Sequence, residues 1–156
     1  LADHGAQPHR SVRAVEQAHA NDPDLLFVYG TLKRGLTNHG MLQAAPFLEE
    51  VWLDGLNLHD LGPFPMAVIG TGRLQGELYR IAPTLLPALD RFEGAPRLYR
   101  RQPWPLWDGR WVWIYLGQPR QVRHSPRLPH GIWPRLEELP PASTRPLDRP
   151  RPCPLP

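Results

Sequence analysis

One glutamate, Glu93, stands where a carboxyl group could move protons. Residues 83–93 carry the clearest helical pattern, with Pro83 suited to the first helical position and Gly94 as the stop signal. Counting by three and four residues from Leu86 reaches Leu89 and then Glu93, on the apolar side of this helix. Burial and the negative end of the helix dipole would both raise the pKa of the carboxyl group. A proton shuttle near neutral pH needs such a raised pKa.

The residue types also allow plainer interpretations. Glu93 could lie in water at a frayed helix end, near Arg97 or Arg100. Glu77 is a competing acid in the middle of an expected strand, where most such residues face solvent. Asp90 lies at the edge of the apolar side of the helix and is expected to be exposed.

A loop after the first expected strand could bind a ligand through its backbone. Residues 25–29 are apolar and run directly into Gly30-Thr31, which Lys33-Arg34 follow. A glycine turn lets a backbone approach another group closely, and consecutive N–H groups can bind a carboxylate or an oxyanion. The glycine, lysine and serine or threonine spacing of a phosphate loop is missing.

Several classes of site and protein are not supported by the residue pattern. There is no serine nucleophile motif, His39 has no triad partner in view, and the single cysteine, Cys153, lies in a proline-rich stretch. No His or Cys spacing suggests a metal site, and no apolar run approaches the roughly 18–20 residues of a membrane span. The net charge of +3 is concentrated towards the C-terminus, so nucleic-acid binding is not expected. A single cysteine suits a reducing compartment, and we expect a cytoplasmic protein.

The elements that would position these residues are mostly short strands. We expect strands at residues 25–29, 47–58, 64–69, 73–81, 98–104 and 110–116. Gly55 marks a bend, and Asp108-Gly109 marks a hairpin between the last two strands. A short helix is expected at residues 37–43, with Thr37 as its cap. Many strands and one or two helices predict an α+β fold with a strongly curved or barrel-like sheet.

Composition divides the chain into three parts. Residues 1–24 form a polar N-terminal extension, in which residues 10–20 could make about three helical turns. Residues 25–117 form the folded domain. Residues 118–156 contain more than half of the 21 prolines and no apolar period, so we expect a Pro/Arg-rich tail that wraps the domain or is disordered.

A set of motifs in this order resembles a known family. The set comprises the stretch from Tyr29 to Gly35 (YGTLKRG), Asn38-His39, the stretch from Gly76 to Tyr79 (GELY), the stretch from Leu89 to Gly94 (LDRFEG), the stretch from Tyr99 to Arg101 (YRR), and Tyr115. Together they resemble the γ-glutamylcyclotransferase-like family, most of all its γ-glutamylamine cyclotransferase branch and bacterial relatives. The resemblance spans about residues 26–116.

The resemblance implies a fold, a reaction and roles for particular residues. It implies a small mixed-sheet β-barrel with flanking helices and an enzyme that needs no cofactor and no metal. The α-amine of a small γ-glutamyl substrate would attack its own γ-carbonyl group, giving 5-oxoproline and a free amine. Glu93 would be the general acid and base. The substrate would be bound by Tyr29, Gly30, Thr31, Leu32, Tyr99 and Tyr115.

Two alternatives stay open. The amine half of the substrate could be a simple amine, an isopeptide lysine, a peptide or a specialised metabolite. The same fold could also serve as a non-catalytic module that binds a small molecule or a partner.

Overall fold

The computed structural model describes residues 23–135, so the possible helix at residues 10–20 lies outside the described part. The strands are β1 (Leu25–Val28), β2 (Phe47–Asp60), β3 (Pro65–Arg80), β4 (Arg100–Pro105) and β5 (Trp111–Leu116). The helices are α2 (Leu86–Phe92) and the 3₁₀ turns η1 (His39–Leu42), η2 (Pro83–Leu85) and η3 (Pro119–Gln121). In the described part of the chain, no helix is long and apolar enough to cross a membrane.

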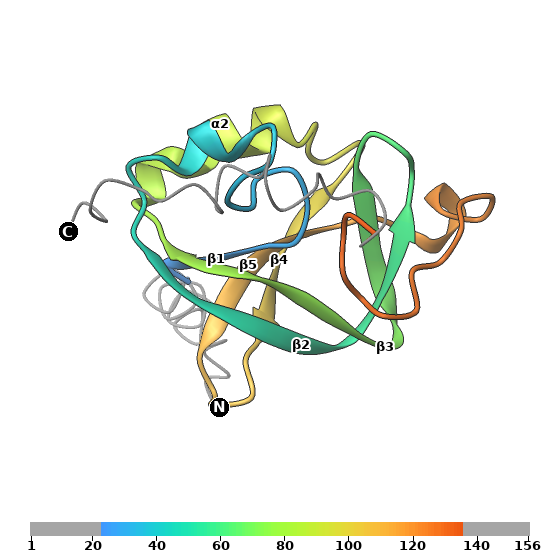
Figure 1. The fold of residues 1–156 in the computed structure, drawn as a ribbon. Coiled ribbons are helices and arrows are strands. Elements are labelled where there is room, and N and C mark those ends of the chain that lie inside the picture. Colours follow the sequence, from blue (N-terminus) through green and yellow to red (C-terminus); the bar gives the residue numbers. More distant parts are fainter. Residues whose placement is uncertain (1–22, 136–156) are drawn as a thin grey trace, which may run out of the picture.

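The strands form one mixed five-stranded sheet in the order β2-β3-β1-β5-β4. β1 is antiparallel to β3 and parallel to β5, with Leu26 opposite both Tyr79 and Trp113. The short β1 therefore lies at the centre, and its C-terminal end delivers the loop at residues 30–38 (Figure 1). The α+β class predicted from the sequence is confirmed.

The sheet curls until its two outer strands approach each other. β2 bends at Gly55, where a bulge breaks the register between Asp54 and Leu56 and φ is +84°. The indole of Trp104 on β4 donates a hydrogen bond to the backbone oxygen of Asp54 at 3.2 Å. Side chains, rather than a backbone ladder, thus join β4 to β2. This seam gives the curved sheet its barrel-like form, and the bend expected at Gly55 is confirmed.

The two strands predicted at residues 64–69 and 73–81 are a single long strand, β3. The sequence suggested a break because Gly70 and Gly72 lie between the two apolar runs. In the structure both glycines make room for Asn57 on β2. A Cβ atom on Gly70 would lie 2.2 Å from the Asn57 side-chain nitrogen, and one on Gly72 would lie 2.8 Å from its oxygen. The glycines therefore serve packing between paired strands, and the prediction of two strands was wrong.

A hydrophobic cluster lies on each face of the sheet. One face and the loops beside it form a cluster around Phe27, Leu53, Leu78 and Ile114. Residues of the other face pack against Leu89 of α2. Figure 1 shows α2 across one end of the sheet. Side chains alternate between the two faces of the sheet, and those of the second face contact α2. Helix α2, and with it Glu93, therefore lies against the same region as the loop after β1.

The helical regions follow the expected stop and start signals with one exception. α2 is preceded by η2, so Pro83 begins a 3₁₀ turn, and Gly94 ends the helix with φ at +64°. The 3₁₀ turn η1 is capped at Asn38, without a side-chain capping bond, instead of at Thr37. The side chain of Asn38 donates a hydrogen bond to Thr31 and is not used as a cap. The prediction that Thr37 caps this helix was wrong.

Residues 118–135 pack onto the domain. Leu128 donates its N–H to the oxygen of Leu58, and Gln75 donates to the oxygen of Gly131. The side chains of Leu128 and Trp133 are buried in the same cluster as Phe27. Figure 1 shows this segment, in orange, beside β2 and β3. The sequence left open whether the region after Gly117 wraps the domain or is disordered. Its described part wraps the domain, and the core extends past Gly117.

Candidate active site

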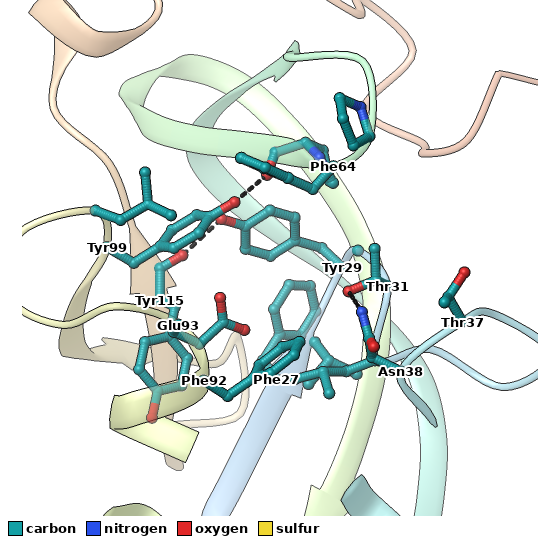
Figure 2. Close-up of a pocket in the computed structure, with 16 residues that line it drawn as sticks. Phe27, Tyr29, Thr31, Thr37, Asn38, Phe64, Phe92, Glu93, Tyr99 and Tyr115 are labelled. Carbon is teal, nitrogen blue, oxygen red and sulfur yellow. Dashed lines mark hydrogen bonds between the residues drawn. The ribbon is translucent and has the colours of Figure 1, made fainter. Parts of the chain in front are cut away.

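A cavity of about 500 Å³ opens where the loop after β1, the start of β3 and the end of α2 meet. Its lining is mostly apolar and aromatic, with a single carboxyl group, that of Glu93. Figure 2 shows the Glu93 carboxyl group pointing in among the labelled aromatic side chains. The lining residues are Phe27, Val28, Tyr29, Gly30, Thr31, Leu32, Thr37, Asn38, Pro63, Phe64, Pro65, Phe92, Glu93, Leu98, Tyr99 and Tyr115.

The loop at residues 30–38 is held in shape by its own polar groups. Asn38 donates its backbone N–H to the Thr31 oxygen at 2.9 Å and its side-chain amide to Thr31 Oγ1 at 3.0 Å. The His39 ring lies with Nδ1 2.9 Å from the Leu32 oxygen, which accepts its hydrogen bond. His39 is thus a structural partner of the loop. These bonds bend residues 31–38 into a closed turn beside the cavity.

Three consecutive N–H groups of this loop are available to a ligand. Gly30, Thr31 and Leu32 all line the cavity, and within residues 23–135 none of their backbone N–H groups has a hydrogen-bond acceptor. Space at Gly30 is tight, because a Cβ atom there would lie 3.0 Å from the ring of Pro65. Successive free N–H groups form a concave site for an oxyanion or a carboxylate.

Glu77 anchors the same loop from outside the cavity. It is 6% exposed, and its carboxylate accepts hydrogen bonds from the Arg34 backbone N–H at 2.8 Å, from Arg34 Nε at 3.1 Å and from the Tyr79 hydroxyl at 3.0 Å. A solvent-facing position, as expected from the strand pattern, was wrong for Glu77. Its buried charge is compensated by Arg34, so Glu77 fixes the middle of the loop.

Glu93 caps the C-terminal end of α2. Its N–H donates to the Leu89 oxygen at 2.9 Å, which continues the helical pattern and turns the side chain towards the cavity. Burial raises the pKa of Glu93 to about 7. In the described part of the chain no basic side chain forms an ion pair with it, so the alternative of a solvated carboxylate near Arg97 or Arg100 is not what the structure shows.

The three tyrosines of the cavity use their hydroxyl groups to hold the fold. Tyr29 donates to the backbone oxygen of Tyr115 at 2.6 Å and accepts from the N–H of Ala67 at 3.1 Å. Tyr99 donates to the backbone oxygen of Pro65 at 2.6 Å. Burial raises the pKa of Tyr29, Tyr99 and Tyr115 above the usual value. These side chains are therefore fixed walls of the cavity and remain protonated.

Asp90 orients the third tyrosine. The Tyr115 hydroxyl donates to Asp90 at 2.7 Å, and Arg101 donates through Nε at 2.8 Å. Burial by itself would raise the pKa of Asp90, but the hydrogen bonds from Arg101 and Tyr115 lower it below the usual value. Asp90 is a half-buried ion-pair partner, so the exposed position expected from the helix pattern was wrong.

All seven site residues expected from the sequence line this one cavity: Tyr29, Gly30, Thr31, Leu32, Glu93, Tyr99 and Tyr115. Phe64 and Pro65 also line the cavity, and they belong to the stretch at residues 61–66 that the sequence suggested as a wall of the pocket on the leaving-group side. Sequence reasoning missed Phe27, which lies on β1 and carries no signal of its own, and did not assign Phe92 to the cavity although it adjoins Glu93. Within residues 23–135, no three His, Cys, Asp or Glu side chains gather closely enough to hold a metal ion.

Comparison with known proteins places the chain in a family. The family described as "Gamma-glutamyl cyclotransferase, AIG2-like" matches residues 26–135. A Vibrio cholerae protein named "Putative gamma-glutamylcyclotransferase" is 37% identical over 110 residues, which are 70% of this chain and 94% of that protein. Human gamma-glutamylaminecyclotransferase is 40% identical over 89 residues, which are 49% of this chain and 58% of the human protein.

The solved structure of Escherichia coli YtfP has the same fold. It superposes with a TM-score of 0.56 at 33% identity, covering 73% of this chain and 99% of that one. The span that the family model matches, residues 26–135, contains most of β1, its loop, Glu93 and all three tyrosines of the cavity. The chain belongs to the γ-glutamylcyclotransferase family of enzymes, in its AIG2-like branch.

Proposed function

We propose that this enzyme cyclises a γ-glutamyl compound, releasing 5-oxoproline and a free amine. The observation that carries the proposal is the Glu93 carboxyl group, which lies in the cavity with a pKa of about 7. A carboxyl group that ionises near neutral pH can accept and return a proton during one turnover. The family's name and the names of its relatives support this reaction class.

The chemistry needs one proton carrier and correct geometry. Ionised Glu93 accepts a proton from the α-ammonium group of the substrate, and the resulting amine attacks the γ-carbonyl carbon. A C–N bond closes the five-membered ring, and the carbonyl oxygen becomes an oxyanion. When the intermediate collapses, the bond to the leaving nitrogen breaks and Glu93 gives the first proton to that nitrogen. The ring nitrogen still carries two hydrogens after the attack, so it loses its second proton to Glu93, which passes that proton to the released amine; the products are the neutral lactam and an ammonium ion. The atoms balance without water, and the attack is intramolecular, so holding the folded substrate supplies much of the rate.

The loop after β1 suits the substrate's anionic groups. The N–H groups of Gly30, Thr31 and Leu32 can bind the α-carboxylate of the glutamyl group or stabilise the oxyanion as it forms. The aromatic wall of Phe27, Phe64 and Tyr99 excludes water around the reacting atoms. A water-poor site strengthens both interactions, because electrostatic attraction is less screened there.

The test is detection of 5-oxoproline by mass spectrometry. The substrates are γ-glutamyl-ε-lysine, γ-glutamylalanine, glutathione and γ-glutamylalkylamines. We expect release from at least one of them, and loss of more than nine-tenths of that turnover in Glu93→Gln. The matched control is Glu49→Gln, the same change at an exposed position on β2, which should keep wild-type turnover.

Two outcomes would count against the proposal. Turnover above a tenth of wild type in Glu93→Gln would show that Glu93 is not the proton carrier. No 5-oxoproline from any substrate, together with measurable substrate binding, would favour the non-catalytic binding module.

A further inference from the structure

A second cavity lies beside the candidate active site, and three arginines line it. It has a volume of about 470 Å³, and Leu98 is the one described residue that lines both cavities. The arginines are Arg97, Arg100 and Arg120. Arg97 lies between α2 and β4, Arg100 begins β4, and Arg120 belongs to η3, after the last strand.

The three arginines have no partner in the described part of the chain. Within residues 23–135, no ion pair or hydrogen bond involves the guanidinium groups of Arg97, Arg100 and Arg120. Most other arginines in this range are paired, for example Arg34 with Glu77. The described lining residues also include no acidic side chain. Three unpaired cations around one concavity create a positive potential that attracts an anion.

Hydrogen bonds hold the two sides of this cavity together. Gln121 of η3 donates its side-chain amide to the backbone oxygen of Leu98 at 2.8 Å. The side-chain oxygen of Gln121 accepts the N–H of Gln118 at 2.7 Å. These bonds tie η3 to the segment that follows α2. The cavity therefore has a built frame, and the backbones that carry its arginines are fixed relative to each other.

The size and lining of the cavity favour a small organic anion. Pockets for small molecules have volumes of about 300–1,000 Å³, and this cavity falls in that range, with more room than one ion needs. Pro96 and Leu98 give it an apolar side next to the arginines. Sites for single-stranded nucleic acid usually stack bases on aromatic side chains, and none of the described lining residues is aromatic.

We propose that this cavity binds a small organic phosphate monoester, with the phosphate group on the three arginines and the organic part against Pro96 and Leu98. Such a phosphate carries a charge of about −1.5 to −2 at pH 7 and three acceptor oxygens. It matches three cations better than a carboxylate does. The planar guanidinium group of arginine binds phosphate through two parallel hydrogen bonds. The inference goes beyond the proposed reaction and does not depend on it.

The experiment is titration calorimetry of the full chain with three probes at one ionic strength. Phenyl phosphate and benzoate share the aromatic ring and differ in the anionic group, whereas inorganic phosphate lacks the ring. We expect phenyl phosphate to bind about tenfold more tightly than benzoate, because it carries more charge and more acceptor oxygens. It should also bind more tightly than inorganic phosphate, because its ring buries apolar surface.

Each comparison has a result that counts against the proposal. Equal affinities for phenyl phosphate and benzoate would overturn the preference for phosphate. Equal affinities for phenyl phosphate and inorganic phosphate would overturn the monoester in favour of the free ion. A single-stranded oligonucleotide that binds more tightly than phenyl phosphate, with an affinity that falls steeply with salt, would assign the arginines to nucleic acid instead.

Paired substitutions then locate the binding site. Arg97→Gln with Arg120→Gln removes one arginine from each side of the cavity, and the affinity for phenyl phosphate should fall by about tenfold or more, because charge-assisted hydrogen bonds are lost. The matched control is Arg91→Gln with Arg123→Gln. It removes the same charge from two exposed arginines that do not line the cavity. The control should change the affinity by less than about twofold, because salt screens exposed charges at a distance.

Urea unfolding checks that both double variants are as stable as wild type, as expected for arginines without a partner in the described part of the chain. Equal losses of affinity in the two double variants would show a general effect of charge and overturn the site. Undiminished binding in the Arg97 and Arg120 variant would overturn it as well, and would place phenyl phosphate elsewhere, for example at the free N–H groups of the loop after β1.

Discussion

The chemistry of Glu93 follows from its place at the end of α2. The helix is short, and the side chain that follows its last turn enters a cavity whose tyrosine hydroxyl groups are already bonded to protein atoms. The carboxylate therefore loses water without gaining a compensating charge, which is why its pKa rises to about 7. The helical period could predict this position from the sequence. The partners of Glu77 and Asp90 could not be predicted, because Arg34 and Tyr115 lie on distant strands and loops.

Activity should depend on the ionisation of Glu93. Because the carboxylate must accept a proton in the first step, we expect kcat/KM to fall about tenfold per pH unit below a pKa near 7. A profile of kcat/KM between pH 5 and pH 8 measures this. A plateau that continues down to about pH 5, near the ordinary range of a glutamate, would contradict the assigned pKa.

The free energy of unfolding should change with pH in the opposite sense to the activity. The pKa of Glu93 is 4.5 by reference and about 7 in the fold, so the folded state binds more protons than the unfolded state between these values, and stability falls as pH rises through this window. Glu93→Gln removes the penalty, which is on the order of 3 kcal/mol at pH 8. Urea unfolding should show the variant more stable than wild type at pH 8. The difference should shrink towards pH 4, and its absence at pH 8 would contradict the prediction.

At the scale of elements, β3 supports the site along much of its length. Its first residue, Pro65, packs against Gly30, and the Pro65 backbone oxygen accepts a hydrogen bond from the Tyr99 hydroxyl. Further along β3, Glu77 accepts a hydrogen bond from Arg34 of the loop. The sequence predicted the apolar runs of β3 correctly but divided them. Glycine normally interrupts strands, and the reason for Gly70 and Gly72 is the Asn57 side chain on the paired strand. Such a reason is visible only once the register is known.

Weakening the anchor of the loop should weaken substrate binding. In Glu77→Gln the charge opposite Arg34 is lost, and we expect the free energy of unfolding to fall by about 2 kcal/mol, as for other buried hydrogen bonds to charged groups. KM should rise more than kcat falls, because Glu77 holds the loop and does not contact the cavity. Glu49→Gln, which removes an exposed pair with Arg110, should change stability by less than about 1 kcal/mol. Equal losses in the two variants, measured by urea unfolding, would refute the anchoring role.

At the scale of the molecule, residues 118–135 complete the core. The proline content of the segment distinguishes it from the rest of the domain in the sequence. That it packs onto the domain could not be predicted, because Leu128 and Trp133 follow no strand or helix period. Its close fit is clear at Gly131, where φ is +69° and an added Cβ atom would lie 1.9 Å from the Arg73 oxygen. The folded unit therefore needs this segment against β2 and β3.

Removing one side chain of this segment should be costly. Trp133 is 8% exposed within the main cluster, so Trp133→Ala should lower the free energy of unfolding by about 3 kcal/mol. Trp107 is 86% exposed in the β4–β5 turn, and Trp107→Ala should change it by less than about 0.5 kcal/mol. Urea unfolding of both variants measures the difference. A similar, small loss in both would mean that the segment contributes little to the fold.

Residues 126–128 pair with the end of β2 at Leu58–Asp60, but elsewhere the side-chain seam between β2 and β4 leaves strand edges without a backbone ladder. Such edges are surfaces on which a second copy of the chain could add a strand. The two edges are protected by different means. On β4, Pro103 and Pro105 remove N–H donors. On β2, the exposed Glu49, Glu50 and Asp54 place charged side chains along the strand, each in an ion pair with an arginine. Proline and charged side chains both oppose strand addition. Both edges of this open, curled sheet thus carry features that oppose pairing with a second copy, although its last ladder is not closed.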